Sequence, residues 1–197
     1  MNAIAREALN QILLEARSFS DWLPKEVSDE DLRKIYDLMR WGPTSANCCP
    51  ARFVFIKDGA AKENLISTLS PNNVKKVKTA PVTVIIAWDE KFYDLIPKLF
   101  PHAAAYRDVF AKDETLAKAT SFRNSSLQGA YFMLAARALG LDCGPMSGFD
   151  NAKLDSLIFA GTSWKSNFIC SLGYGDRSKL HPRLPRLDFD EACKVLK

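Results

Sequence analysis

The sequence predicts an α+β fold in a single domain that spans residues 1–197. Several segments carry apolar residues at the helical spacing, and others are short runs of β-branched and aromatic residues, which are typical of strands. The two kinds of segment alternate without the regular strand, helix, strand order of a doubly wound sheet. With 197 residues, of which 47% are hydrophobic, the chain has enough apolar material for one core.

Apolar spacing predicts the helices. The first covers residues 7–17, and the second begins at Ser28, where a hydroxyl precedes three acidic residues, and stops before Gly42-Pro43. The longest spans residues 114–139, and a small one begins at Asp190. The stripe expected to be buried on the second helix is Leu32, Ile35, Tyr36 and Met39. The corresponding face of the longest helix is Leu127, Ala130, Tyr131, Leu134, Ala135 and Ala138.

Three runs predict strands. Residues 82–87 are rich in β-branched side chains and indicate a central strand, while residues 53–56 and 168–172 indicate two further buried strands. Residues 65–69 suggest a short helix.

Two other segments are less regular. Ser70 to Asn73 is interpreted as a break in the chain. Residues 89–111 mix aromatic residues with prolines and predict short helices around a pocket or an interface.

Composition argues against several classes of protein. The net charge of +4 is spread along the chain, with no basic run longer than Lys75-Lys76, so no nucleic-acid partner is expected. The longest apolar run, residues 82–88, is far shorter than the roughly 18 residues of a spanning helix, so no membrane partner is expected. The first ten residues lack the apolar block of a secretory signal, and a cytoplasmic location is expected. Five irregularly spaced cysteines and two histidines predict free thiols and no metal site.

Three local patterns admit a chemical and a structural interpretation, and we favour the structural one for each. Residues 173–178 half resemble a dinucleotide fingerprint, but the third glycine is replaced by Ser178. Cys143 and His181 could form a nucleophilic pair, but no orienting partner accompanies them. The adjacent Cys48 and Cys49 would form a strained ring on oxidation.

Longer strings carry a more specific signal. They are Trp41-Gly42-Pro43-Thr44-Ser45-Ala46-Asn47, Phe122-Arg123-Asn124-Ser125-Ser126, Gly144-Pro145-Met146-Ser147-Gly148-Phe149-Asp150 and Arg183-Leu184-Pro185-Arg186-Leu187. In order and spacing they resemble the nitroreductase family of FMN-dependent oxidoreductases over essentially the whole chain. The most similar branch is that of malonic semialdehyde reductases of pyrimidine utilisation. The resemblance implies a nitroreductase-like fold, with a mostly antiparallel central sheet flanked by helices, and an intertwined homodimer with shared FMN sites.

The resemblance also implies which residues bind FMN. The matching positions are Arg17, Ser18, Pro43, Thr44, Ser45, Asn47, Asn73, Lys76, Pro145, Ser147, Gly148, His181 and Arg183. Arg183 matches a phosphate-binding arginine, a task that suits the guanidinium fork. Ser18 follows Arg17 at the start of the first flavin motif, and its hydroxyl is a candidate donor to the flavin tail. Relatives often carry more basic residues around Ser18 and a lysine at the position of His181, so a larger share of the phosphate charge is expected to rest on Arg183.

The other matching positions imply contacts with the flavin ring. Residues 43–47 match a loop that reaches across from the partner subunit. Asn73 and Lys76 match groups that approach the flavin pyrimidine, where a cation would stabilise the negative charge of reduction. Residues 145–148 match a segment whose backbone amides approach flavin O4 and N5.

The function implied is a ping-pong reductase that takes a hydride from NADH or NADPH through FMN and passes it to a small-molecule acceptor. Because the flavin performs the chemistry, we assign no catalytic side chain. The implied acceptor is malonic semialdehyde, which would become 3-hydroxypropionate, with Arg52, Arg107 and Arg123 as candidates to hold its carboxylate. The alternatives are a broad-specificity nitroreductase or quinone reductase, and a flavin-binding protein without turnover.

Overall fold

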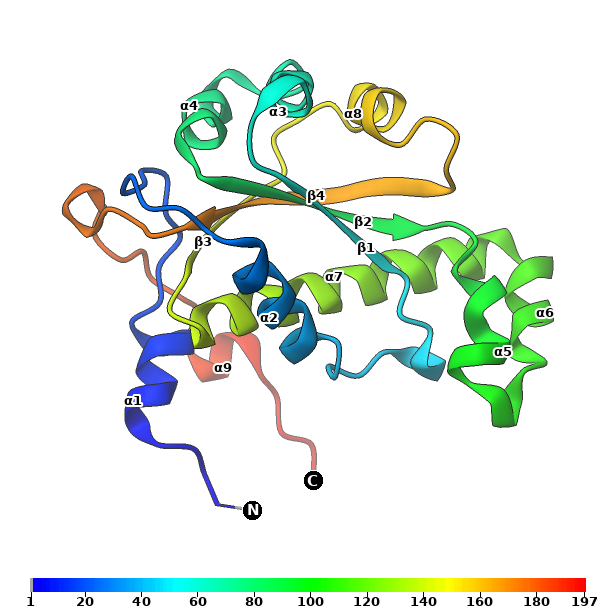
Figure 1. Ribbon diagram of the computed structural model, residues 1–197. Helices are drawn as coiled ribbons and strands as arrows, with labels where there is room; N and C mark the ends of the chain where they lie inside the picture. Colours follow the sequence, from blue (N-terminus) through cyan, green and yellow to red (C-terminus); the bar gives the residue numbers. More distant parts are fainter. Residues whose placement is uncertain (1) are drawn as a thin grey trace.

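A four-stranded antiparallel sheet forms the centre of the structure, a computed structural model that describes residues 2–197 (Figure 1). Its strands are β1 (Ala51–Ile56), β2 (Val82–Asp89), β3 (Asp142–Met146) and β4 (Trp164–Gly173). Their order across the sheet is β1-β2-β4-β3, so β1 and β3 are the two edges. The predicted α+β fold with an antiparallel sheet flanked by helices is confirmed.

Helices cover both faces of this sheet. The helices within residues 2–197 are α1 (Arg6–Leu9), α2 (Asp29–Met39), α3 (Gly59–Ile66), α4 (Pro71–Thr79), α5 (Ile96–Leu99), α6 (Tyr106–Lys112), α7 (Glu114–Ala138), α8 (Asn151–Ile158) and α9 (Phe189–Ala192). Short 3-10 turns are η2 (Ser45–Asn47), η3 (Phe92–Leu95), η4 (Pro101–Ala103) and η5 (Arg177–Lys179), and η1 (Asn10–Leu14) is a π-helical turn. In Figure 1, α3, α4 and α8 lie above the sheet, and α2 and α7 lie below it.

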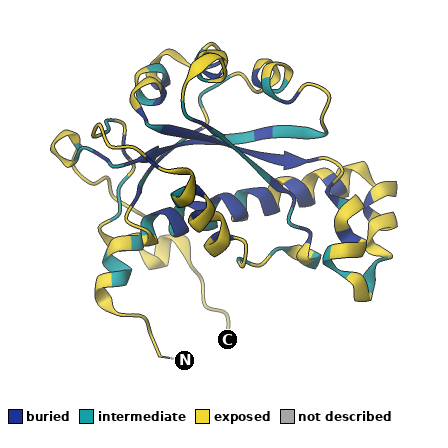
Figure 2. Cartoon of the chain, viewed as in Figure 1, coloured by how far each residue is buried: buried dark blue, intermediate teal, exposed yellow. Residues whose placement is uncertain are grey.

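Alternation along the strands divides the core into two layers. Val84 and Ile86 of β2 point to the layer that contains Phe132 of α7 and Ile35 of α2. The neighbouring Ile85 belongs to the other layer, with side chains from α3, α4 and α8. Every residue of β2 is therefore buried, as Figure 2 shows, which explains why its sequence is apolar without interruption.

Local signals located several elements correctly. The Ser28 hydroxyl accepts a hydrogen bond from the Asp31 amide at 3.1 Å, and the Asp31 carboxylate accepts one from the Ser28 amide, so the predicted N-cap of α2 is a capping box. The predicted helix 114–139 is α7, and the three predicted strands are parts of β1, β2 and β4. The segment 89–111 contains the short helices expected of it.

Other expectations were wrong. The first helix is shorter than predicted, because α1 ends at Leu9 and the π-helical turn η1 that follows it ends at Leu14. The expected break at residues 70–73 is the start of α4, since Pro71 occupies the first turn, where its missing amide costs nothing. Strand β3 and helix α8 were not predicted.

The buried faces of two helices match the prediction in part, since Leu32, Ile35 and Met39 of α2 and Ala135 of α7 are buried. Leu127 of α7 is 42% exposed and Tyr36 of α2 is 48% exposed. The buried stripe of α7 also contains polar residues, among them Asn124 and Gln128. This stripe faces the start of β1, where the Gln128 side-chain oxygen accepts a hydrogen bond from the Ala51 amide at 2.9 Å.

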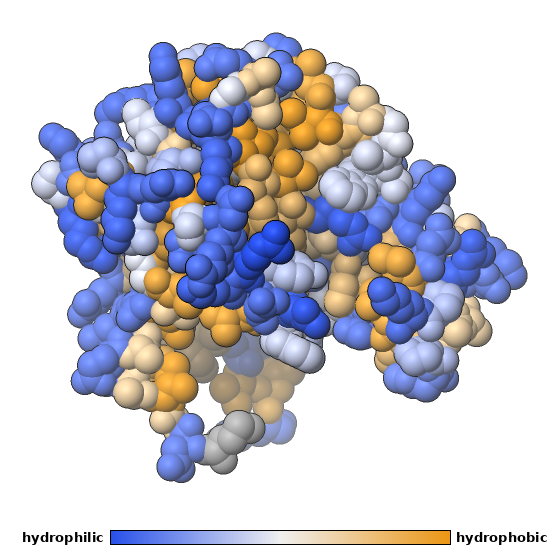
Figure 3. All heavy atoms as spheres, viewed as in Figure 1, coloured by the Kyte–Doolittle hydropathy of each residue, from blue (hydrophilic) through white to orange (hydrophobic). Residues whose placement is uncertain are grey.

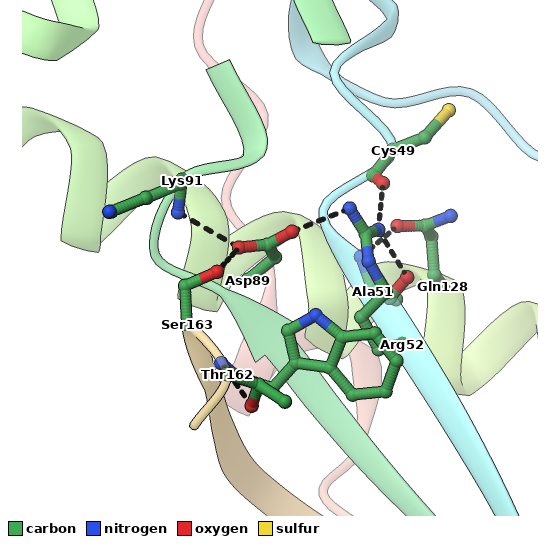
Figure 4. A network of polar contacts seen from close by, with 9 residues as sticks. Cys49, Ala51, Arg52, Asp89, Lys91, Gln128, Thr162 and Ser163 are labelled. Carbon is green, nitrogen blue, oxygen red and sulfur yellow. Dashed lines mark hydrogen bonds and ion pairs between the residues drawn. The ribbon is translucent and has the colours of Figure 1, made fainter. Parts of the chain in front are cut away.

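A charged network closes one end of the sheet (Figure 4). The Arg52 guanidinium donates to the Asp89 carboxylate at 2.7 Å and to the carbonyls of Cys49 and Ala51. Asp89 also accepts hydrogen bonds from the Ser163 hydroxyl and the Lys91 amide. The pair joins β1 to β2 with little access to solvent, since the side chains are 19% and 11% exposed.

We expect Asp89→Asn to lower the free energy of unfolding by about 3 kcal/mol, because it leaves the Arg52 cation largely buried without its counter-charge. Urea unfolding followed by circular dichroism measures the loss. The matched control is Asp94→Asn, which breaks the exposed pair with Arg107 and should cost about 0.5 kcal/mol or less. Equal losses in the two variants would contradict a structural role for the Arg52 pair.

Candidate functional site

The segment that follows η1 lies against the edge strand β3. The Phe19 amide donates to the Cys143 carbonyl at 3.0 Å, and Ser18 forms a parallel bridge with Cys143. A Cβ atom at Gly144 would lie 2.3 Å from the Phe19 carbonyl oxygen, and one at Gly175 would lie 2.0 Å from the Phe19 ring. These glycines permit close backbone approach, and the Gly-Tyr-Gly sequence after β4 is structural, as interpreted from the sequence.

A cavity of about 710 Å³ opens beside this segment. Arg17, Ser18, His181 and Arg183, four of the predicted flavin contacts, line it together. Arg17 donates to the His181 carbonyl, and Arg183 donates to the Ala16 carbonyl at 3.1 Å. The two arginines therefore fasten the C-terminal segment to the residues after η1, and the structure brings together residues that are far apart in the sequence.

The lining of this cavity is strongly cationic. Its basic residues are Arg17, Arg137, Lys179, His181, Arg183 and Arg186. Its two carboxylates have other partners, since Asp21 accepts from Lys75 at 2.6 Å and Asp176 accepts from the Ser178 amide and hydroxyl, which lower the pKa of Asp176. None of the six basic residues belongs to an ion pair within residues 2–197. A group of cations without counter-charges is suited to an anionic ligand.

A second cluster lies where β3 ends. The Asn73 amide nitrogen donates to the Gly148 carbonyl at 3.0 Å, and the Lys76 ammonium donates to the Asn73 side-chain oxygen at 3.2 Å. A Cβ at Gly148 would lie 2.7 Å from the Asn73 amide nitrogen, so the backbone here must remain bare for Asn73 to bind it. The structure thus places Asn73, Lys76 and Gly148 together, next to Pro145 on β3 and Ser147 just after it.

The two clusters lie along β3, and we name them together the strip. Its predicted flavin contacts are Arg17, Ser18, Asn73, Lys76, Pro145, Ser147, Gly148, His181 and Arg183. Lys75 of α4 binds Asp21, which lines the cationic cavity, while its neighbour Lys76 points to the second cluster. The strip therefore runs from the C-terminal segment, past the residues after η1, to the first turns of α4. Neither Asp21 nor Lys75 was identified from the sequence.

The loop at residues 43–49 is held in an unusual conformation. Ala46, Asn47 and Cys49 have φ angles of 49°, 48° and 38°, and they are the non-glycine residues with positive φ within residues 2–197. The Ser45 amide donates to the Asn124 side chain at 2.8 Å, and the Asn47 side chain donates to the Leu99 carbonyl at 2.7 Å. Strained backbone that other elements hold in place is characteristic of functional loops.

This loop is distant from the strip in the same chain. Pro43, Thr44, Ser45 and Asn47 lie beside α7 and α5, because Tyr131 binds the Pro43 carbonyl and Asn47 binds Leu99. In Figure 1, α5 and α4 lie at opposite ends of the molecule. Within one chain, nine of the thirteen predicted flavin contacts therefore lie on the strip. The other four lie in the loop at residues 43–49.

The cysteines carry no reactive arrangement in the described chain. All five are free thiols, as predicted, and burial raises the pKa of Cys48 to about 12. Cys143 is buried on β3, and the pKa of Cys170 is raised by a hydrogen bond with Cys143 and by burial. A fully buried thiol is out of reach of a substrate, which supports the structural interpretation of Cys143. No group of residues that could hold a metal ion occurs within residues 2–197.

The three arginines considered for a substrate carboxylate differ in their partners. Arg52 is bound to Asp89 and to two carbonyls, and Arg107 is bound to Asp94 and Asp108. Arg123 is exposed on α7, and its guanidinium has no hydrogen-bond or ion-pair partner within residues 2–197. Of the three, Arg123 is the cation left available to a ligand.

Two further residues of the site were missed in the sequence, and both lie on α7. Asn124 holds the loop through Ser45, and Arg137 lines the cationic cavity. The signal for Asn124 was a run of polar residues within a long predicted helix, whose buried face was expected to be apolar. Arg137 resembled an ordinary cation in the last turn of a helix.

No helix within residues 2–197 is both long and apolar enough to cross a membrane.

Comparison with known proteins shows the family of the chain. The model of the nitroreductase family matches residues 13–174. A Ralstonia nicotianae protein named as an NADH dehydrogenase/NAD(P)H nitroreductase is 53% identical over 196 residues, with 100% of each chain covered.

Solved structures share the fold at lower identity. A nitroreductase of Bacillus subtilis has a TM-score of 0.85 at 21% identity, covering 98% of this chain and 100% of its own. A nitroreductase of Exiguobacterium sibiricum, solved in complex with FMN, has a TM-score of 0.83 at 20% identity with 100% of both chains covered. A gut-bacterial enone reductase has a TM-score of 0.81 at 18% identity, covering 99% of this chain and 100% of its own. The nitroreductase-like fold predicted from the sequence is confirmed, and the chain belongs to the nitroreductase family of oxidoreductases.

Proposed function

We propose that the chain is an NAD(P)H-dependent oxidoreductase that holds FMN along the strip beside β3. The observation that carries this proposal is the cavity whose basic residues lack counter-charges within residues 2–197, because it suits the phosphate of a bound cofactor. The family, the FMN in the Exiguobacterium sibiricum structure and the name of the Ralstonia nicotianae relative support the same choice of cofactor and electron donor.

The residues of the strip fit the two ends of FMN. Arg17 and Arg183 can bind the phosphate through guanidinium groups that no carboxylate neutralises, and Ser18 adds a hydroxyl beside them. The bare backbone at Gly148 and the neighbouring Asn73 offer amide donors to a planar polar ring.

FMN, when bound, supplies the hydride chemistry of the reaction. Lys76 places an ammonium group at the end of the strip, where it would stabilise the negative charge that reduction brings. The backbone N–H groups of Ser147 and Gly148 would orient the flavin ring. In this proposal the protein binds, orients and stabilises charge, and no side chain acts as a nucleophile.

An anaerobic absorbance measurement tests the proposal. We expect the purified protein, supplied with FMN, to show a flavin band that stoichiometric NADH or NADPH bleaches. A band that neither donor bleaches would support a flavin-binding protein without turnover. Failure to bind added FMN would contradict the assignment of the whole strip.

We further propose that the site is completed by the partner subunit of a homodimer. Pro43, Thr44, Ser45 and Asn47 lie far from the strip in one chain, so a site containing all thirteen predicted contacts needs a second copy. The single chain also exposes large hydrophobic side chains, including Trp41 at 78% on the turn after α2 and Phe122 at 50% on α7. Figure 3 shows hydrophobic residues at the surface between hydrophilic rims, and a surface of this kind is typical of a protein interface.

Complementation between two inactive variants tests the shared site. Asn47→Ala alters the loop, and Lys76→Ala alters the strip, so each homodimer should lose activity. In mixed dimers one of the two sites combines the intact loop of one chain with the intact strip of the other. Random pairing should therefore restore about one quarter of the sites, measured as activity per dimer after coexpression. If sites were built within single chains, coexpression would restore none.

For the acceptor we propose malonic semialdehyde, with Arg123 holding its carboxylate. The support is the resemblance of the sequence motifs to that branch and the unpaired state of Arg123 within the described chain, one residue before Asn124, which anchors the loop. A free guanidinium forms a bidentate, charge-assisted contact with a carboxylate.

We expect Arg123→Gln to raise KM for malonic semialdehyde about tenfold or more, as for the loss of a hydrogen bond to a charged group. The KM for an uncharged nitrofuran should stay the same in steady-state assays. Arg107→Gln is the control, because that guanidinium already has two carboxylate partners. If the wild-type protein reduced the nitrofuran better than the aldehyde, the broad-specificity nitroreductase would replace this proposal.

A further inference from the structure

We propose that Arg137 is a phosphate-binding residue of the flavin site, in addition to Arg17 and Arg183. This inference rests on the proposed function. It concerns a residue in the last turn of α7, more than a hundred positions from Arg17 in the sequence. Arg137 would bring the long central helix into direct contact with the cofactor.

The first argument is position. Arg137 lines the same cavity of about 710 Å³ as Arg17, Ser18 and Arg183. It approaches from α7, whereas the other two arginines come from the segments before and after it in the chain. A phosphate in this cavity would thus meet guanidinium groups from three separate parts of the structure.

The second argument is an unsatisfied donor. The Nη1 atom of Arg137 donates to the Ile12 carbonyl at 3.2 Å, but its Nε atom is buried without any hydrogen-bond partner within residues 2–197. A buried N–H group without an acceptor is costly, and native structures rarely leave one unexplained. A phosphate oxygen would be a suitable acceptor, because a guanidinium can bind phosphate through two N–H groups at once.

The third argument is charge. Glu7, Glu15 and Asp142 line a neighbouring cavity with Arg137, yet none of them is within ion-pair distance of it. The cation therefore keeps its full charge beside the phosphate end of the strip. Residues 16–20 contribute a single cation, Arg17, so a further guanidinium from α7 supplies charge that this segment lacks.

A purely structural role would explain less. A cation at the C-terminus of a helix is favourable, and Arg137 also touches the turn η1. However, the carbonyls of Arg137 and Ala138 are already bonded by the Gln11 side chain, at 2.7 and 3.2 Å. The helix end and its contact with η1 are thus secured by Gln11, and the buried Nε atom still needs an acceptor.

Comparison of FMN with riboflavin tests the inference, because the two differ only in the phosphate. Flavin-stripped full-length protein is titrated with each, and the dissociation constant is taken from quenching of flavin fluorescence. We expect Arg137→Gln to weaken FMN binding about tenfold or more and to leave riboflavin binding unchanged. FMN binding by Arg137→Lys should be weaker than that of the wild type and tighter than that of Arg137→Gln, since lysine retains the charge but lacks the guanidinium fork.

Two controls separate charge from structure. Arg177→Gln removes the same charge from the neighbouring cavity and should leave the ratio of FMN to riboflavin affinity as in the wild type. Gln11→Ala loosens η1 on α7 and should change both affinities by the same factor. If circular dichroism shows that Arg137→Gln does not fold, Arg137→Lys is compared with the wild type, and a lower ratio of FMN to riboflavin affinity is expected because the lysine lacks the guanidinium fork.

The inference is overturned if Arg137→Gln weakens FMN and riboflavin equally or changes neither. For Arg137→Lys, an unchanged ratio of FMN to riboflavin affinity would overturn it as well. A wild-type protein that binds neither flavin would instead contradict the proposed function itself. The two failures are therefore distinguishable in one set of titrations.

Discussion

The site depends on the contact between the backbone at Phe19 and the edge strand β3. One hydrogen bond, from the Phe19 amide to the Cys143 carbonyl, joins the segment after η1 to the sheet. The contact is possible because Gly144 has no side chain to obstruct the Phe19 carbonyl. A strand at the edge of a sheet has free backbone groups on its outer side, and here the N-terminal segment and the candidate cofactor strip use that side.

Charge and hydrogen bonding follow from this contact. Once Ser18 is on the edge of the sheet, Arg17 and Arg183 can each bind a carbonyl of the other's segment, which fixes their stems and leaves their charges without counter-ions in the described chain. The arginine between β1 and β2 differs, because Arg52 forms an ion pair with Asp89 that stabilises that end of the sheet. The fold thus separates a paired, structural arginine from unpaired arginines that are available to an anion, and this contrast in pairing could not be seen in the sequence.

The elements predicted correctly from the sequence are those that depend on interactions between residues close together in the chain. The capping box at Ser28 and the length of α7 were predicted because caps and helical periodicity are encoded within a few residues. Strand β3 was missed because Gly144 and Pro145 disfavour a strand unless it lies at an edge, and its position there depends on pairing with β4. The buried face of α7 was predicted only in part for a related reason, since Asn124 and Gln128 are buried where they bond a loop and a strand distant in sequence.

The sequence motifs indicated which residues lie together at the candidate site better than they indicated which helices and strands hold those residues there. They identified Asn73, Lys76 and Gly148, and in the structure Asn73 is hydrogen-bonded to both of the others, but they assigned neither Asn124 nor Arg137 to the site. That helix separates two tasks along its length, with Arg137 at the end beside the strip and Arg123 exposed near the loop. An enone reductase shares the fold at 18% identity, so the fold alone does not determine the acceptor. Arg17 and Arg183 are held by backbone carbonyls, whereas Arg123 has no hydrogen-bond partner within residues 2–197. The choice of acceptor is therefore expected to depend on groups that the fold leaves free, such as Arg123.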